Sequence, residues 1–389
     1  MDLATFAELR SPAGQVALAA AADLRPTDAT VLAVLERLRK HIPPALARAA
    51  VETVILRAKA RAKFTHADAM YFTREALEQS SGETVSRYRA ERFAGDPAVG
   101  DFCCGVGGDA IALAGVARVA AIDADPLRLA MAGENLAAYG VRDRVTLLAG
   151  DLLDVPLPPV PAAFFDPDRR SGGRRHVAIR DYQPPLDAVR ARLPADFPLG
   201  VKVAPAVAWA ELAGYDAEVE FVSVGGELKE CVLWFGPLRT ARRRATLLPG
   251  RHTLAADAPA PVPPPGPPRA VLYDPDTAVV RAGLVSNLAE QLDAHPLDPD
   301  IAYLTGDGLR SSPFVSTYHI EESLPFHLRR LGERLRALGV GHVTVTKRGS
   351  AVDPADLVRR LRLSGPDRRV VVLTRVLGRP YALIARPPV

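Results

Sequence analysis

The sequence of 389 residues is long enough for two or three domains and a sizeable hydrophobic core. With 48% hydrophobic and 24% charged residues, its composition is typical of a globular protein, and no apolar run approaches the roughly 18 residues of a membrane span. The N-terminus lacks a basic leader with an apolar core, so we expect a cytoplasmic protein without membrane association. Three cysteines provide neither a disulfide framework nor the paired Cys-x-x-Cys set of a zinc site, so no metal is expected.

The net charge of +4 is distributed unevenly along the chain. Residues 100–236 carry 19 acidic and 13 basic side chains, whereas residues 237–269 carry one acidic and six basic side chains. This division suits a middle region that binds a cationic ligand and flanks that contact a polyanion. A solvated surface of an arginine-rich protein explains these numbers of charged residues nearly as well.

The first 94 residues are predicted to be helical. Pro43-Pro44 can open a helix at its first turn, and apolar residues follow at helical spacing between positions 46 and 55. The stretch Thr65-His66-Ala67-Asp68 matches a capping box and predicts the start of another helix.

A glycine-rich stretch from Val99 to Asp109 organises the middle of the chain and reads V-G-D-F-C-C-G-V-G-G-D. A short apolar run ends in Asp101, three glycines follow in a loop, and helical character begins at Ala110. This pattern is typical of a strand, a tight turn and a helix N-terminus, where glycines let a ligand approach the backbone closely.

The acid ahead of the glycines distinguishes two cofactor classes that use such a turn. A dinucleotide turn has the pattern G-x-G-x-x-G, whereas a turn for S-adenosylmethionine also has an acid just before its glycines. The methyl donor carries an ammonium and a sulfonium but no pyrophosphate, so Asp101 suits it and would repel phosphates. Cys103 and Cys104 are expected to be small apolar fillers of the turn.

Three further strand-like runs each end in a carboxylate, at Asp123, Asp151 and Asp166. Asp123 is placed to accept hydrogen bonds from ribose hydroxyls, and Asp151 could receive an adenine amine. In a parallel sheet these strand ends lie on one edge, where ligands bind. Each acid alone could equally be a helix N-cap, but the ordered series favours a ligand site.

Together these motifs resemble the class I S-adenosylmethionine-dependent methyltransferases. The resemblance covers roughly residues 95–236 and is closest to the trimethylguanosine synthase-like and other RNA methyltransferases. It implies a Rossmann-like α/β fold with a seven-stranded sheet. The motifs that carry it are D-F-C-C-G-V-G-G-D, A-I-D-A-D-P, N-L-A-A-Y-G-V, V-T-L-L-A-G-D and F-F-D-P.

The resemblance also implies S-adenosylmethionine as the cofactor and identifies residues that would hold it. Many class I methyltransferases place a segment ahead of the glycine turn that closes over the cofactor, so Phe72 and Thr73 could line the site. Ordinary helix packing is the favoured interpretation of those two. The expected cofactor-binding residues are Asp101, Cys103, Gly105, Gly107, Gly108, Asp109, Asp123, Ala124, Asp151 and Leu152.

The substrate motif departs from the family pattern. Methyltransferases of exocyclic or ring nitrogens carry [D/N]-P-P-[F/Y/W], whose side-chain oxygen and first proline carbonyl accept hydrogen bonds from the amine while the aromatic ring stacks on the base. Asp166 and Pro167 match its start and are the predicted catalytic residues, with Asp166 orienting the acceptor and serving as a base. Asp168 and Arg169 replace the second proline and the aromatic residue.

The same residues allow a second interpretation, because Asp-Pro-x-Arg also resembles the motif of uridine C5-methyltransferases. Those enzymes need a cysteine nucleophile. Cys231 lies in E-C-V-L-W-F, which is more typical of a buried strand than of a catalytic loop.

Basic residues cluster next to the predicted reaction centre. Guanidinium groups on a loop would bind phosphates or a guanine edge, which we favour over a merely solvated loop. Lys202, in a predicted fifth strand, could also point towards the pocket. The expected substrate-binding residues are Arg169, Arg170, Arg174 and Arg175.

The C-terminal part begins after a proline-rich spacer at 258–268, which is preceded by a predicted hairpin at 217–235. Its predicted helices include 324–338 and 354–361, and a final hairpin turns at Gly378. This part resembles the THUMP-like domains that follow a methyltransferase in a group of bacterial proteins. THUMP domains proper bind structured RNA.

The sequence therefore predicts a cytoplasmic enzyme that uses S-adenosylmethionine to methylate a base in structured RNA, either transfer RNA or ribosomal RNA. Two alternatives stay open, namely a methyltransferase that acts on a protein or small molecule and a non-catalytic RNA-binding protein that retains the fold. The predicted parts are a helical segment (1–94), a class I methyltransferase domain (95–245), a proline-rich linker (246–269) and a THUMP-like domain (270–389).

Overall fold

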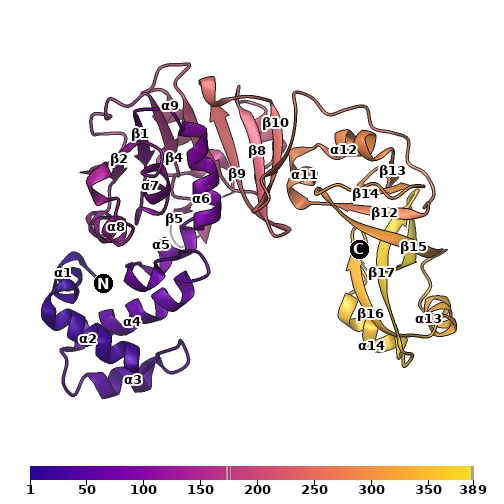
Figure 1. Ribbon diagram of the computed structural model, residues 1–389, viewed down its shortest axis with the longest axis horizontal. Coiled ribbons are helices and arrows are strands. Elements are labelled where there is room, and N and C mark those ends of the chain that lie inside the picture. The colour runs from indigo at the N-terminus through magenta and orange to yellow at the C-terminus, as the bar shows by residue number, and fades with distance from the viewer. Residues whose placement is uncertain (172–173, 176, 387–389) are drawn as a thin grey trace. The chain divides into compact units, whose positions relative to one another are not determined.

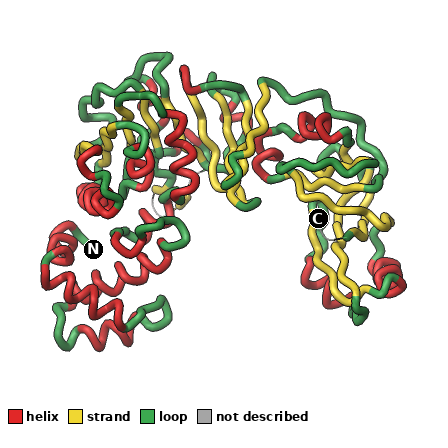
Figure 2. The backbone as a smooth tube through the Cα atoms, in the orientation of Figure 1, coloured by secondary structure: helices red, strands yellow, loops and turns green. Residues whose placement is uncertain are grey.

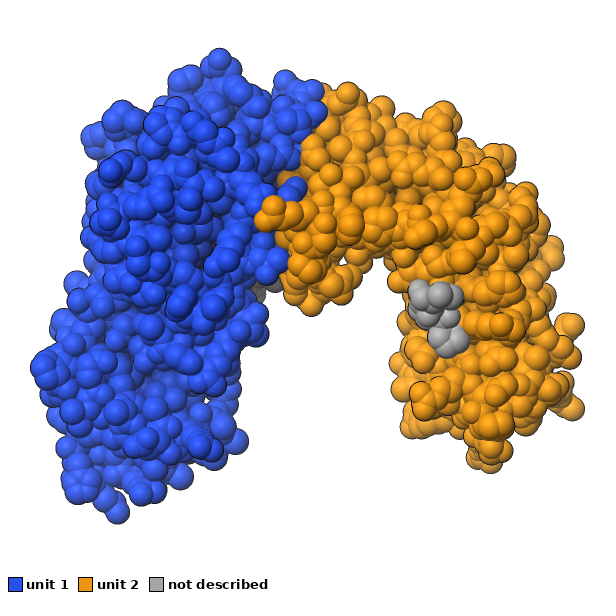
Figure 3. Space-filling model, viewed as in Figure 1, with its two compact units in different colours: residues 1–218, 230–240 blue, residues 219–229, 241–389 orange. Residues whose placement is uncertain are grey.

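The computed structural model describes residues 1–171, 174–175 and 177–386, with the backbone alone for residues 170–171 and 174–175. The chain forms two compact units, which Figure 3 colours separately. Within the described residues, no helix combines the length and apolar character needed to cross a membrane. Unit 1 comprises Met1–Glu218 and Glu230–Thr240, and unit 2 comprises Val219–Lys229 and Ala241–Val389.

The N-terminal part of unit 1 is helical, as predicted (Figure 1). Helix α4 begins at Pro44, as predicted from the Pro43-Pro44 pair, and packs against α1, α2 and α3. Side-chain caps begin several of the helices; Thr73, for example, accepts a hydrogen bond from the backbone of Ala76. The helices are α1 (Leu3–Arg10), α2 (Pro12–Asp23), α3 (Val31–Leu38), α4 (Pro44–Ala60), α5 (Arg74–Gln79) and α6 (Glu83–Ala90), with short 3₁₀ turns η1 (Ala67–Ala69) and η2 (Glu91–Phe93).

The capping box predicted at 65–68 is wrong. The 3₁₀ turn η1 has no side-chain cap. Instead, the backbone amide and the hydroxyl of Thr65 both donate to the Glu83 carboxylate, each at 2.6 Å. The Thr65 hydroxyl therefore donates to a residue that is distant in the sequence, on α6, instead of capping the helix that the local pattern predicted.

A central sheet in unit 1 carries the acid-tipped strands. Its strands lie in the order β9-β7-β4-β1-β2-β3; β1, β2, β3, β4 and β7 run parallel, and β9 pairs antiparallel with β7. Because these five strands are parallel, their carboxyl ends meet at one edge. The strands are β1 (Ala98–Phe102), β2 (Arg118–Asp123), β3 (Val145–Ala149), β4 (Ala162–Phe165), β7 (Leu199–Val203) and β9 (Glu227–Phe235).

Short helices connect these strands and cover the sheet. Helix α8 packs on β2 and β3, and α7 packs on β1 and β2. The buried amide of Asn135, on α8, bonds the backbone of Tyr71 and of Val106, which joins the N-terminal helices to the turn after β1. The connections contain α7 (Gly108–Leu113), α8 (Pro126–Ala138), η3 (Arg142–Arg144), the hairpin β5 (Arg170–Ser171) and β6 (Arg174–Arg175), η4 (Ile179–Asp181), α9 (Leu186–Arg190), α10 (Trp209–Leu212) and η5 (Gly236–Leu238).

Unit 2 begins with three strands, β8 (Glu218–Val224), β10 (Arg243–Leu248) and β11 (His252–Ala256). Strand β10 runs parallel to β8 and antiparallel to β11. The hairpin predicted at 217–235 is present as β8 and β9, joined through Gly225 and Gly226, which both adopt a positive φ. Two strands thus occupy part of the range expected to be a linker, whereas residues 257–270 contain neither strand nor helix.

The rest of unit 2 is an α/β domain built on a second sheet, whose strands dominate the C-terminal part in Figure 2. Its order is β13-β14-β12-β15-β18-β17-β16, and helices α13 and α14 pack beside β16. The α/β fold with an N-terminal helical segment is therefore confirmed. The elements are β12 (Val271–Pro275), α11 (Thr277–Ala282), α12 (Val285–Leu292), β13 (His295–Asp298), β14 (Ile301–Gly306), β15 (Val315–Pro325), α13 (Leu328–Ala337), β16 (Val340–Lys347), α14 (Pro354–Leu361), β17 (Asp367–Val376) and β18 (Arg379–Ala385).

Candidate active site

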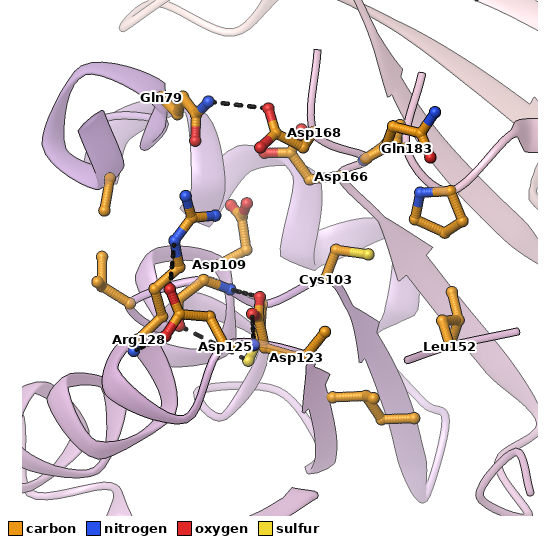
Figure 4. Close-up of a pocket in the computed structure, with 18 of the residues that line it drawn as sticks. Gln79, Cys103, Asp109, Asp123, Asp125, Arg128, Leu152, Asp166, Asp168 and Gln183 are labelled. Carbon is orange, nitrogen blue, oxygen red and sulfur yellow. Dashed lines mark hydrogen bonds and ion pairs between the residues drawn. The ribbon is translucent and has the colours of Figure 1, made fainter. Parts of the chain in front are cut away.

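A cavity of about 430 Å³ lies at the carboxyl edge of the central sheet in unit 1 (Figure 4). This volume falls within the range of about 300–1,000 Å³ that is usual for small-molecule sites. Seven carboxylates and two arginines are among the lining residues, so the cavity is strongly acidic. The lining residues fall within six segments, 76–81, 103–109, 122–128, 150–153, 166–169 and 183–184, although not every residue of a segment lines the cavity.

Most of the predicted cofactor residues meet in this cavity. Asp101 and Gly107 do not line it. The predicted catalytic residues Asp166 and Pro167 line it too, as does Arg169, whereas the side chains of Arg170, Arg174 and Arg175 lie outside what the structure describes. The cofactor candidates in the lining are Cys103, Gly105, Gly108, Asp109, Asp123, Ala124, Asp151 and Leu152.

The turn after β1 has a left-handed backbone at three positions. Cys103, Gly105 and Gly107 have φ values of 64°, 54° and 82°. A non-glycine residue in this region is uncommon, and such outliers cluster at functional sites. A Cβ added at Gly105 would meet no atom within 4 Å, so its backbone faces open space where a ligand fits. At Gly107 the added Cβ would lie 3.2 Å from the Cβ of Ala132, so this glycine serves the packing of α8 instead.

Asp123 ties the end of β2 to the glycine turn. Its two carboxylate oxygens accept hydrogen bonds from the backbone amides of Gly105, at 2.7 Å, and Asp125, at 2.9 Å. Burial raises the pKa of Asp123. Burial likewise raises the pKa of the neighbouring Cys103 thiol well above its ordinary value, and the charge of Asp123 adds to the effect. Cys103 is therefore a neutral thiol in the cavity wall.

Asp101 lies beneath the turn, fully buried. Neither of its carboxylate oxygens has a hydrogen-bond partner among the described residues. Burial raises the pKa of Asp101 well above its ordinary value, and the charges of Asp109 and Asp166 raise it further. The buried position of Asp101 thus disfavours its charged form.

Asp109 has the opposite surroundings. The guanidinium of Arg89, on α6, pairs with Asp109 and also donates to Glu230 at 2.7 Å, while the Ser86 hydroxyl donates to Asp109 at 2.7 Å. Burial opposes ionisation, but Arg89 and Lys202 lower the pKa of Asp109. Burial raises the pKa of Glu230 to about 7 against the same two cations.

Lys202 joins the predicted catalytic carboxylate to the N-terminal helices. Its ammonium donates to Asp166 at 2.6 Å and to the backbone carbonyl of Gln79 at 3.3 Å. The Gln79 amide in turn donates to Asp168 at 3.0 Å, as the dashed line in Figure 4 shows. The backbones of Asp168 and Gln183 exchange two hydrogen bonds, at 2.8 and 2.9 Å, which bring Gln183 and Pro184 into the cavity wall.

Sequence reasoning missed the segment that the N-terminal helices contribute to the cavity. Phe72 is buried 5.6 Å from the ring of Phe64, and Thr73 caps α5, so neither lines the cavity and packing explains both. Residues 78–81, at the end of α5, line it instead. The polar run Gln-Ser-Ser-Gly after a short helix is the signal that could have marked them.

Cys231, the cysteine considered as the nucleophile of a C5-methyltransferase, is not at the site. Cys231 is fully buried on β9, opposite Val203 of β7, and does not line the cavity. The structure therefore gives no support to the uridine C5 interpretation.

The parallel sheet with its acidic cavity defines the class of protein, a Rossmann-like methyltransferase fold. A solved protein from Porphyromonas gingivalis W83, described as a methyltransferase, matches the fold with a TM-score of 0.75 at 21% identity, covering 93% of this chain and 99% of that one. Family models match as RNA cap guanine-N2 methyltransferase at 98–189, THUMP domain-like at 315–387 and a domain of unknown function at 2–60.

Relatives at higher identity define the family. An uncharacterized S-adenosylmethionine-dependent methyltransferase of Mycobacterium tuberculosis, recorded for two strains, is 38% identical over 358 residues, covering 87% of this chain and 96% of that protein. The chain belongs to this family of S-adenosylmethionine-dependent methyltransferases. The site fits the cofactor, because open space faces Gly105 and an acidic lining suits a ligand with a sulfonium and an ammonium.

Proposed function

We propose that this methyltransferase acts on a base in structured RNA, either transfer RNA or ribosomal RNA, in the cytoplasm. The observation that carries the proposal is that Asp166, Pro167 and Arg169 line the same cavity as the glycine turn. Among the described residues the Arg169 Nη1 atom is buried without a hydrogen-bond partner, so the guanidinium is available for an acceptor. A guanidinium can bind a phosphate or stack on a base, which offers a substitute for the missing aromatic residue.

S-adenosylmethionine, when bound, supplies an activated methyl group. Asp123 and Asp151 would hold its ribose and adenine, and the backbone at Gly105 would allow its close approach. The Asp166 carboxylate and the Pro167 carbonyl would accept hydrogen bonds from the acceptor, and Asp166 would take up its proton. Such a displacement needs chiefly alignment of the acceptor with the donor methyl group.

Two family models support RNA as the substrate class. The RNA cap guanine-N2 methyltransferase model covers the glycine turn and the Asp166-Pro167 motif, and the THUMP domain-like model covers most of the C-terminal domain. We therefore assign substrate capture to the C-terminal domain (270–389) and to the arginine-bearing loop. Arg170, Arg174 and Arg175 would contact phosphates there.

Nucleoside mass spectrometry tests the proposal. Transfer RNA and ribosomal RNA are isolated from cells with and without the gene, and we expect one methylated nucleoside to be missing from one pool. The purified protein should restore it on the deficient RNA with labelled S-adenosylmethionine. Because phosphate contacts release counterions, the affinity for that RNA should fall steeply with salt. Unchanged nucleosides in both pools would instead favour a protein or small-molecule substrate.

A further inference from the structure

Lys202 lies in the middle of the central sheet with almost no exposure to solvent. It belongs to β7, a strand that is buried along its whole length, and only 4% of the residue is exposed. A buried ammonium is costly unless it is paired and hydrogen-bonded. Its ammonium donates to two groups of the cavity wall, the Asp166 carboxylate and the Gln79 carbonyl.

The ion pair leaves one oxygen of Asp166 for another partner. Lys202 binds Oδ2 at 2.6 Å, whereas Oδ1 has no hydrogen bond within the part of the chain that the structure describes. The Asp166 side chain is 19% exposed and lines the cavity, and its backbone amide is fixed by the Phe102 carbonyl at 3.1 Å. The Asp166 carboxylate is thus bound through Oδ2, whereas Oδ1 can accept a hydrogen bond from another group.

The surroundings make the positive charge of Lys202 important for that carboxylate. Arg89 is the other buried cation of the cluster, and its guanidinium already serves Asp109 and Glu230. Without Lys202 the negative charges would outnumber the positive ones further, which disfavours ionised carboxylates. The charged or titratable groups facing Asp166 or Lys202 are Asp101 (β1), Cys103 (turn), Asp109 (α7), Arg89 (α6) and Glu230 (β9).

We infer that Lys202 is a positioning residue of methyl transfer. Its ammonium holds the Asp166 carboxylate turned so that Oδ1 faces the acceptor, and its bond to the Gln79 carbonyl fixes the cavity wall of residues 78–81 relative to the same point. The inference rests on the proposed role of Asp166 towards the acceptor, but it does not depend on the acceptor being RNA.

The first test measures Asp166 directly in the full-length protein, without any substrate. Aspartate carboxyl carbons are labelled with carbon-13, and the Asp166 signal is identified by its loss in D166N. We expect the carbon-13 chemical shift of this signal to change in K202Q, because Asp166 Oδ2 loses its bond to the ammonium. K229M is the matched control, because Lys229 is an exposed lysine on the neighbouring strand β9. An Asp166 carbon-13 shift that is equal in K202Q and wild type would overturn the inference.

The second test measures transfer of the labelled methyl group from S-adenosylmethionine to RNA from cells that lack the gene. K202Q should lower kcat by about 100-fold, move the acid limb of the pH–rate profile to higher pH and leave the affinity for S-adenosylmethionine unchanged. A purely structural role would lower stability and cofactor affinity without moving the pH profile.

The two tests separate the inference from the proposed function. If the wild type transfers no label to RNA, the RNA proposal fails, whereas the carbon-13 measurement still decides the role of Lys202. If K202Q does not fold, K202R decides, because a guanidinium keeps the charge but cannot reproduce the ammonium geometry. A K202R rate equal to that of wild type would then overturn the inference.

Discussion

The two ends of the glycine turn hold carboxylates in opposite environments. Asp101, at its start, is fully buried without a partner among the described residues, and burial raises its pKa well above the ordinary value. Asp109, near its end, has Arg89 and Ser86 as partners, and its pKa is lowered although burial opposes this. Both residues are aspartates, so the partners that α6 supplies to Asp109 account for the opposite directions of the two pKa shifts.

The largest expected effect comes from removing that partner. R89M would leave Asp109 and Glu230 buried without their cation. Asp109 would then lie in surroundings similar to those of Asp101, without a cationic partner. We expect the free energy of unfolding to fall by about 3–5 kcal/mol, measured by urea denaturation. R87M is the control on the same helix, because the Arg87 side chain is 63% exposed and pairs with Glu83. It should cost less than about 1 kcal/mol, and equal losses in both variants would contradict the comparison.

A pH dependence of stability should follow from the protonated carboxyls. The folded pKa of Glu230 is raised to about 7 from an ordinary value of 4.5, so the folded state keeps a proton that the unfolded state releases between these values. Stability should therefore decrease as pH rises from 4.5 to 7, by at most about 1.4 kcal/mol per pH unit for this group.

Thermal or urea unfolding across this pH range measures the effect. E230Q should reduce the decrease in stability with rising pH, because an amide does not titrate. D101N should reduce it as well, since the pKa of Asp101 is raised in the same direction. E227Q, at an exposed position on β9, should leave the slope as in wild type. A wild-type stability that rises across this range would refute the assignment of protonated buried carboxyls.

The smallest effect on stability is expected at the centre of the turn. G105A should cost about 1–2 kcal/mol through its left-handed backbone, and its methyl group would project into the space expected for the cofactor. We expect the affinity for S-adenosylmethionine, measured by calorimetry, to fall at least tenfold. G225A is the matched control, because Gly225 has a φ of 58° against 54° at Gly105 and equally open surroundings. G225A should lose a similar amount of stability through its left-handed backbone, without any loss of affinity for S-adenosylmethionine.

The sequence was informative where function depends on local patterns. Strand, turn and acid follow one another in the chain, so the gathering of Asp123, Asp151 and Asp166 at one sheet edge could be predicted from spacing alone. The helix at Pro44 and the hairpin at Gly378 were equally predictable, because proline and glycine act locally.

Contacts between distant segments could not be predicted in this way. Glu83 takes the hydroxyl of Thr65, and Gln79 reaches Asp168 across 89 positions. Nothing in the neighbourhood of either residue in the sequence indicates its partner. Arg89 is the buried counter-ion of two acids, Asp109 and Glu230, which lie far from it in the sequence. Tertiary packing decides such pairs.

The backbone bridge between Asp168 and Gln183 has a consequence for how this enzyme can diversify. The bridge joins the two ends of the loop that carries the arginines, and it lies close in sequence to the predicted catalytic residues Asp166 and Pro167. Insertions or deletions within it would cost little closure entropy and would leave Asp166 in place. Evolution, or a protein engineer grafting sequences from relatives, could therefore exchange the loop that we propose binds the substrate while retaining the predicted catalytic residues.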